Sequence, residues 1–234
     1  MSAESTHPTS GDPDPIRVLI ADDEALVRAG FRVLVDSAPD LTVLAEAGNG
    51  GEAVRLTRQL RPDVVLMDIR MPIMDGLEAM QHIAAGGVDG PHVLIVTTFD
   101  QDEHVFQALR SGASGFVLKD SPPEELLRAI RVVASGDALL TPSITRRMIS
   151  AFARQPSAPS ALPGALATLT DREREVFEHI AAGRSNAEIA DTLYVSVATV
   201  KTHVGRLLTK LDVRDRAQLV VLAYETGIVV PGSN

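Results

Sequence analysis

The sequence predicts two domains: an α/β domain with a doubly wound, five-stranded parallel sheet, followed by an all-α domain of four helices. Between residues 16 and 135, five short apolar runs alternate with amphipathic helical patterns. This alternation is typical of a parallel sheet covered by helices. From residue 166 onward the apolar residues recur at helical spacing, apart from an ambiguous run at 228–230.

The expected strands are short, nearly continuous apolar runs, as for strands buried on both faces of a parallel sheet. The segments between them have one apolar face and one polar face, which indicates helices packed on that sheet. In chain order, strands are expected at 17–21, 42–47, 64–67, 92–97 and 115–118, and helices at 25–37, 51–60, 76–84, 103–111 and 123–134.

The tail, the linker and the helices of the second domain are predicted from composition and from residues that cap helices. Residues 1–15 are rich in Ser, Pro and Asp and are expected to form a disordered tail. Residues 136–165 are expected to form a linker, with a possible helix at 143–153 before the proline-rich stretch RQPSAPSALPG. The four helices of the second domain, 166–230, are expected to begin near 171, 186, 197 and 217, after capping signals at Thr170 with Glu173, Ser185 with Glu188, and Ser196.

Composition excludes several classes of protein. There is no cysteine, so neither a disulfide framework nor thiolate chemistry is expected. No apolar run approaches the roughly 18 residues of a membrane span, which favours a soluble, cytoplasmic protein without a membrane partner. The net charge of −9 argues against nucleic acid, but residues 196–216 hold five Lys/Arg against two Asp. Such a local reversal of charge matters more than the total.

Three carboxylates stand at the carboxyl ends of two predicted strands. Asp22 and Asp23 follow the first strand, and Asp68 follows the third. In a sheet of order 2-1-3-4-5 these strands are neighbours at the topological switch point, where ligands bind. Three clustered acids raise each other's pKa unless a cation is present, and Mg²⁺ suits oxygen ligands. A single Asp more often caps a helix or turn, but capping does not account for three acids at adjacent strand ends.

Two further polar side chains end the last two strands. Thr97 closes the fourth strand and Lys119 closes the fifth. A hydroxyl and an ammonium beside a metal-bound carboxylate would stabilise an anion built onto that carboxylate. The pattern therefore predicts that Asp68 is a nucleophile that forms an aspartyl phosphate.

The motifs DDE, MDIRMPIMDG, VTT and GFVLKD occur in this order, and residues 16–135 resemble the flavodoxin-like receiver domain of two-component response regulators. The resemblance implies that a histidine kinase phosphorylates Asp68. The receiver can catalyse its own phosphorylation and dephosphorylation without being an enzyme in the usual sense. The resemblance also assigns Mg²⁺ to the acidic pair Asp22 and Asp23, Asp68 and the main-chain carbonyl of Arg70, a switch pair to Thr97 and Phe116, and the phosphate contact to Lys119.

The third helix of the second domain carries the prediction of DNA binding. Its apolar residues form one stripe, and the opposite face has small residues with a basic rim, which suits a DNA major groove. An ordinary solvated helix face is the alternative. The expected DNA contacts are Ser196, Ala198, Thr199, Lys201, Thr202, His203, Arg206 and Lys210.

Residues 166–230 resemble the helix-turn-helix domain of the NarL/FixJ and LuxR group through LTDRE, AAGRSNAEIA, VATVKTHVGRLLTKL and RAQLV. The resemblance implies a transcription regulator that binds double-stranded promoter DNA as a homodimer once activated, with RNA polymerase as a further candidate partner. Many relatives have a polar or basic residue where Gly205 stands. We expect the unphosphorylated receiver to mask the third helix, and dimerisation to use Leu219, Val220, Leu222 and Ala223 of the fourth.

Two other functions remain open at this point. An aspartate-nucleophile phosphohydrolase would use the same carboxylates, but such enzymes usually carry a second acid where Arg70 stands. A binding module that acts through protein contacts alone would need neither phosphate nor DNA.

Overall fold

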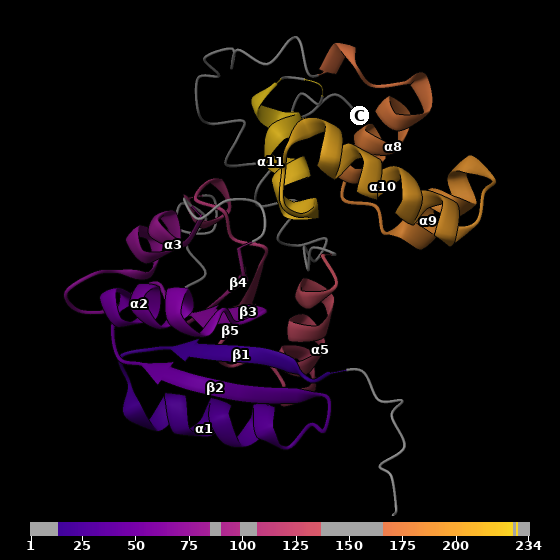
Figure 1. Cartoon of the computed structure of the whole chain (residues 1–234). Helices are drawn as coiled ribbons and strands as arrows, with labels where there is room; N and C mark the ends of the chain where they lie inside the picture. Colours follow the sequence, from indigo (N-terminus) through magenta and orange to yellow (C-terminus); the bar gives the residue numbers. More distant parts are fainter. Residues whose placement is uncertain (1–13, 85–89, 99–106, 137–165, 227, 229–234) are drawn as a thin grey trace, which may run out of the picture.

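The computed structural model describes residues 14–84, 90–98, 107–136, 166–226 and 228. Within these ranges an α/β domain is followed by a helical domain that lies against one edge of it (Figure 1). Most of the predicted N-terminal tail, all but the first residue of the linker with its possible helix, and the apolar residues 229–230 lie outside the described residues.

The first domain is built on a five-stranded, all-parallel sheet. The strand order is β2-β1-β3-β4-β5, as predicted. In this order β1 and β3 are neighbours, with Ala21 beside Met67 at their carboxyl ends. The strands are β1 (Ile16–Ala21), β2 (Leu41–Ala47), β3 (Val64–Met67), β4 (His92–Thr97) and β5 (Gly115–Leu118).

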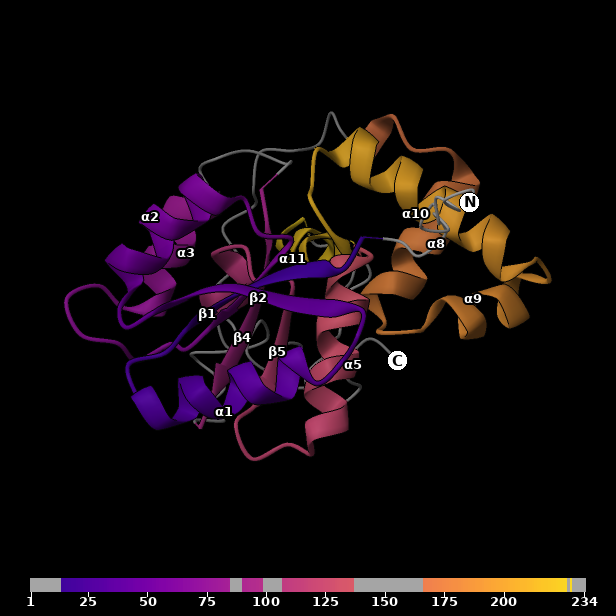
Figure 2. The ribbon, with the colours of Figure 1, turned by 60° about the horizontal axis from the view of Figure 1, so that its bottom comes forward.

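Helices cover both faces of this sheet (Figure 2). Successive side chains of a strand point to opposite faces, so Val65 and Met67 pack in one layer and Val64 and Leu66 in the other. The continuous apolar runs are therefore explained by burial on both sides. The first layer contains α2 (Gly50–Leu60) and α3 (Gly76–Ala84), and the second contains α1 (Ala25–Asp36) and α5 (Pro123–Ala134).

The second domain contains the four predicted helices. Thr170 and Ser185 form the two predicted capping boxes, and the Ser196 side chain accepts the backbone N–H of Thr199 as an N-cap. Asp215 caps the fourth helix by accepting the N–H of Gln218. No helix in the described part of the chain is long and apolar enough to cross a membrane. The helices are α8 (Asp171–Ala181), α9 (Asn186–Leu193), α10 (Val197–Leu211) and α11 (Arg216–Glu225).

An ion pair joins the end of α10 to the start of α8. Lys210 Nζ lies 2.7 Å from Glu173 Oε2 and 3.2 Å from the carbonyl oxygen of Thr168. Glu173 is only 3% exposed, and the hydrogen bond from Lys210, with those from Thr170, lowers its pKa to about 2. Lys210 was predicted to contact DNA, but here its ammonium is engaged within the domain, because the capping glutamate is buried and needs a cation.

We expect Lys210→Met to destabilise the chain. The substitution keeps an apolar stem but leaves Glu173 buried without its cation, so the free energy of unfolding should fall by about 1.5–3 kcal/mol, the range for a hydrogen bond to a charged group. Urea denaturation at pH 7 measures this. The exposed Lys201 of the same helix provides the control, because Lys201→Met should change stability by about 0.5 kcal/mol or less.

The same pair predicts a pH dependence. The pKa of Glu173 is about 2 in the folded chain against a usual 4.5. Its contribution to stability is therefore complete above about pH 4.5 and is lost as the pH falls toward 2. The stability difference between the chain and Lys210→Met should shrink over this window; equal stability of the two proteins at pH 7 would contradict the structural role.

Candidate functional site

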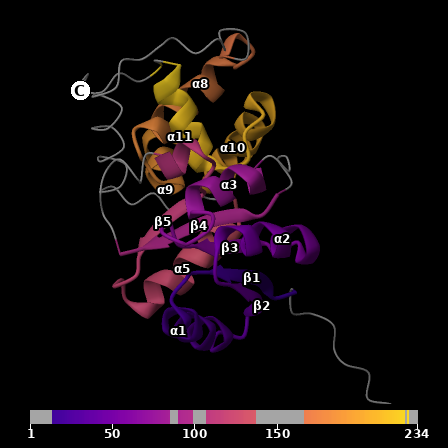
Figure 3. The ribbon, with the colours of Figure 1, turned by 90° about the vertical axis from the view of Figure 1, so that its left-hand side faces the viewer.

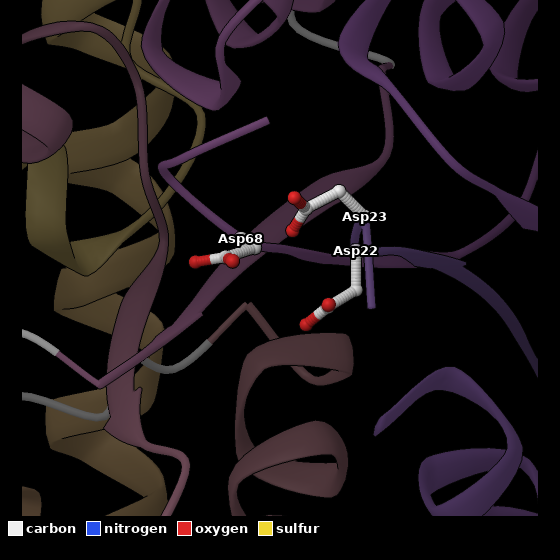
Figure 4. Close-up of side chains that lie close together, drawn as sticks. All are labelled: Asp22, Asp23 and Asp68. Carbon is white, nitrogen blue, oxygen red and sulfur yellow. The ribbon is translucent and has the colours of Figure 1, made fainter. Parts of the chain in front are cut away.

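The three predicted carboxylates meet at the carboxyl edge of the sheet. Asp22 and Asp23 follow β1, and Asp68 follows the adjacent strand β3. One carboxylate oxygen of each lies within 4.8 Å of the other two, and the side chains converge from the two strands (Figure 4). Asp22 and Asp68 are buried, whereas Asp23 is exposed. The predicted convergence is thus present, with one acid open to solvent.

Lys119 supplies the positive charge for the two buried acids. Its Nζ lies 2.6 Å from Asp22 Oδ2 and 2.9 Å from Asp68 Oδ2. Burial lowers the pKa of Lys119, but its hydrogen bonds to both carboxylates outweigh this effect and raise the pKa above its usual value. Burial raises the pKa of Asp68, and the ammonium only partly opposes that rise. One lysine therefore compensates the two buried acids only in part, which leaves the cluster with an excess of negative charge.

Main-chain contacts fix Asp68 in place. Its N–H donates to the carbonyl of Ala21, and its Oδ1 accepts the N–H of Ile69 at 2.7 Å. The start of α3 passes close behind, since the N–H of Gly76 donates to the carbonyl of Ile69. A Cβ at Gly76 would overlap the backbone carbonyl oxygen of Asp68. Sequence reasoning assigned no role to Gly76, although the Asp-Gly pair of MDG was the available signal for a close backbone approach.

A cavity of about 550 Å³ adjoins the cluster at Asp23. Asp23, Arg70, Asp75 and Gln107 contribute polar side chains to its wall. An all-oxygen set of carboxylates beside open space fits a hard divalent cation that keeps several of its waters. The cluster can therefore hold a metal ion while leaving room for a phosphate-bearing ligand.

The two predicted switch residues lie inside the domain. Thr97 is fully buried at the end of β4, and Phe116 of β5 is 3% exposed. The N–H of Lys119 donates to the carbonyl of Thr97 at 2.9 Å, which joins the two strand ends. As a member of the switch pair implied by the resemblance, Phe116 would turn inward on phosphorylation, but its ring is already buried. That inward movement is not available from this conformation.

The predicted DNA-facing side of α10 is exposed. Val200, Val204 and Leu207 are buried in the helical domain, while Lys201 and Arg206 are on the exposed surface. The prediction that the receiver masks this helix is therefore not met in this structure. His203 is half-buried, and its Nδ1 is enclosed without a hydrogen-bond partner within the described chain. The exposed members of the predicted set are Ser196, Ala198, Thr199, Lys201, Thr202, Arg206 and Lys210.

The first domain instead contacts α11 and the turn before it (Figure 3). Ser114 Oγ donates to Asp215 Oδ2 at 2.5 Å, and His92 Nδ1 lies 3.6 Å from the same oxygen. Gln218 Nε2 donates to the carbonyls of Leu109 and Ala113. Two arginines complete the contact: Arg214 donates to the carbonyls of Pro91 and Gly112, and Arg110 Nε lies 2.8 Å from Glu225 Oε1.

Helix α11 has no free apolar face in this structure. Tyr224 donates its hydroxyl to the carbonyl of Ala181 in α8, and burial raises its pKa to about 12. Gln218 and Glu225, which contact the first domain, are two turns apart on another side of the helix. The predicted dimer residues Leu219, Val220, Leu222 and Ala223 are all buried, so they are not available to a second copy.

Sequence reasoning missed this contact between the domains. The available signal was that α11 is apolar around most of its circumference, which indicates a helix buried on several sides. Asp215 is 0% exposed and serves both as the cap of α11 and as the acceptor for Ser114, a pairing that sequence spacing does not predict.

Comparisons with known proteins agree with this architecture. The chain matches the response regulator receiver domain over residues 18–131 and the bacterial regulatory proteins of the luxR family over residues 167–223. It is 44% identical over 216 residues to the uncharacterized transcriptional regulatory protein YxjL of Bacillus subtilis (strain 168), covering 92% of this chain and 98% of that one. These matches are to transcription regulators rather than to phosphohydrolases.

Two solved structures are also similar. The response regulator ChrA, from a heme-sensing two-component system, has a TM-score of 0.51 and 34% identity, covering 93% of this chain and 100% of that chain. A structure of two RcsB dimers bound to two parallel DNAs has a TM-score of 0.54, covering 91% and 99% of the two chains, and at 22% identity it supports the fold alone. A receiver domain implies a kinase as a partner, and a luxR-family domain implies DNA. The chain therefore belongs to the two-component response regulators that join a receiver domain to a luxR-type helix-turn-helix domain, and it is a transcription regulator.

Proposed function

We propose that a histidine kinase phosphorylates Asp68 with the help of Mg²⁺, and that this controls dimerisation and binding of α10 to promoter DNA. The observation that carries the proposal is the cluster of Asp22, Asp23 and Asp68 beside Lys119, in the same chain as an exposed luxR-type recognition helix. The dimer on a promoter would present its surface to RNA polymerase.

The carboxylate of Asp68 is placed to act as the nucleophile. One of its oxygens attacks the phosphorus of a phosphohistidine and the P–N bond breaks. The electron pair of that bond stays on the imidazole, which leaves as the neutral base because its other nitrogen already carries a proton. Lys119 and the hydroxyl of Thr97 would stabilise the phosphoryl oxygens. The same residues would support phosphorylation from a small phosphodonor and later hydrolysis of the acyl phosphate.

Asp23, Asp68 and the main-chain carbonyl of Arg70 are the proposed Mg²⁺ ligands, with Asp22 as the second member of the acidic pair. Asp23 is exposed on the cavity wall, so it can bind an ion without disturbing the buried pair of Asp22 and Lys119. When bound, the ion would neutralise charge between the acids and the incoming phosphoryl group.

The contact between the domains suggests how phosphorylation is transmitted. Ser114 and His92 lie at the amino ends of β5 and β4, while Lys119 and Thr97 lie at the carboxyl ends of the same strands. A shift of these two strands would move residues at both edges of the receiver, beside Asp68 and at the contact with α11. We infer that phosphorylation releases α11, and that Leu222, which is one turn from Gln218 on the receiver-facing side, then packs against a second copy together with Leu219, Val220 and Ala223.

Phosphoryl labelling tests the assignment of Asp68. With radioactive phosphoramidate and Mg²⁺, the chain should gain hydroxylamine-labile label, Asp68→Asn should gain none, and Asp23→Asn should label at least about tenfold more slowly. Asp75→Asn is the matched control, because Asp75 lines the same cavity and caps α3, a role that Asn can also fill. Label retained in Asp68→Asn, or steady hydrolysis of p-nitrophenyl phosphate, would contradict the proposal.

Lys119 and Mg²⁺ are expected to compete for the carboxylate of Asp68, whose Oδ2 lies 2.9 Å from the ammonium. Lys119→Met should therefore bind Mg²⁺ on the order of tenfold more tightly, as measured by isothermal titration calorimetry, and yet label more slowly. Since burial raises the pKa of Asp68, Mg²⁺ affinity should fall as the pH is lowered toward that pKa, and Asp68→Asn should lose most of this dependence. Weaker Mg²⁺ binding in Lys119→Met would oppose the model.

A cross-link between the domains tests the release of α11. The chain has no cysteine, so Arg110→Cys/Glu225→Cys can be joined by a short bismaleimide without side reactions at other thiols. After treatment with beryllofluoride and Mg²⁺, the free chain should dimerise in light scattering, with a dissociation constant at least about tenfold lower than that of the cross-linked chain.

The control joins Asp40→Cys to Arg131→Cys, which replaces a surface ion pair within the receiver and does not span the domains. That cross-linked chain should dimerise normally. Equal dimerisation of both cross-linked chains would show that α11 need not be released.

A further inference from the structure

The DNA-facing side of α10 has an unusual chemistry for base recognition. Ala198, Thr202, Gly205 and Thr209 are all exposed and lie along one line of the helix, at spacings of four, three and four residues. The site itself is identified by the luxR-family match and by the exposed face of the helix. This line of residues indicates which DNA the site binds.

The two threonine hydroxyls are already used within the helix. Thr202 Oγ1 donates to the carbonyl of Ala198 at 3.0 Å, and Thr209 Oγ1 donates to the carbonyl of Gly205 at 3.1 Å. Bonds of this kind, to the carbonyl four residues earlier, hold one rotamer of threonine in a helix. The hydroxyl protons are therefore not free to bond a base, so each hydroxyl can only accept a hydrogen bond. The methyl groups are the apolar parts that these two side chains present.

Gly205 has no structural reason to be glycine. A Cβ at this position would meet no atom within 4 Å, and glycine weakens a helix relative to alanine. Its effect is to remove any side chain between Thr202 and Thr209. The helix backbone can then approach another surface more closely there, without offering it a hydrogen-bond donor.

Charged side chains are confined to the borders of this line. Lys201 and Arg206 are exposed on either side of it, where they can reach the phosphates that position a helix in a groove. Guanine is usually recognised by Arg or Lys, and adenine by Asn or Gln, in the centre of the reading face. The methyl groups of Ala and Thr instead complement the C5-methyl of thymine, the only apolar group in the major groove.

We propose that α10 selects its half-site through thymine methyl groups, read by Ala198 and Thr202 with Gly205 allowing close approach. The DNA taken by this site is then a duplex with thymines at the centre of each half-site, rather than one with a guanine core. The inference rests on the proposed function, because α10 must lie in a major groove.

Replacement of thymine by deoxyuridine tests the proposal, because it removes only the methyl group. Duplexes are first selected from a random pool with the full chain activated by beryllofluoride and Mg²⁺. Binding of a selected duplex is then measured with each central thymine replaced. Each contacted position should weaken binding about fourfold, the size expected for one buried methyl group. Unchanged affinity for the fully substituted duplex would overturn the proposal.

Variants of Thr202 locate the protein side of the contact. Thr202→Ser keeps the hydroxyl and its bond to Ala198 but loses the methyl, so it should bind the thymine duplex about fourfold less tightly and the matched uracil duplex unchanged. Thr202→Val keeps a methyl and should retain the preference for thymine. Lys201→Ala is the control: it should weaken binding to both duplexes equally and reduce the salt dependence.

The possible failures are distinguishable. If the activated chain enriches no duplex, the proposed DNA-binding function itself is wrong. If it enriches duplexes with central guanines whose binding ignores thymine methyls, the function stands and this inference alone is wrong.

Discussion

Asp22 and Asp68 share the ammonium of Lys119 at the carboxyl edge of the sheet, and the rest of the receiver depends on this arrangement. Burial of a carboxylate is costly unless a cation or hydrogen bonds compensate it. The cation here comes from the end of β5, whereas the acids come from the ends of β1 and β3. The ammonium can reach both acids only because the three strands end at the same edge of the sheet, so the chemistry of the site and the topology of the sheet are coupled.

Strands β4 and β5 connect two opposite edges of the receiver. At the carboxyl edge they carry Thr97 and Lys119, and at the amino edge His92 and Ser114 contact the capping residue of α11. The fully buried Asp215 lies in that contact, so separating the domains would expose a carboxylate that is now hydrogen bonded. A polar contact of this kind is easier to reverse than an apolar interface of equal size, because water can replace its hydrogen bonds when the domains part.

The exposed face and the end of α10 have different roles in the structure, although residues of both were predicted to contact DNA. The exposed face of α10 is the one proposed to read DNA, while the end of the helix holds Glu173 through Lys210. In the proposed mechanism, regulation acts on α11, whose predicted dimer face is covered, rather than on α10. If phosphorylation controls dimerisation, the receiver does not need to cover the DNA-binding surface of α10.

Much of the fold could be predicted from the sequence alone, because strands and helix starts depend mainly on residues that are close together in the chain. Apolar runs located the strands almost to the residue, Ser and Thr before Glu located the helix starts, and acids after strands located the cluster around Asp68. The burial of Phe116 and the pairing of Lys210 with Glu173 were not predicted, because both depend on residues that are distant in the sequence.

Only the tertiary structure decided the contact between Asp215 and Ser114, the burial of α11 and the exposure of α10. These features join residues about 100 positions apart, and no spacing rule along the chain encodes such a pairing. The sequence determined which groups could be charged, apolar or hydrogen bonding. The fold determined which of them are close enough to pair, because interaction energies depend on separation in space rather than along the chain.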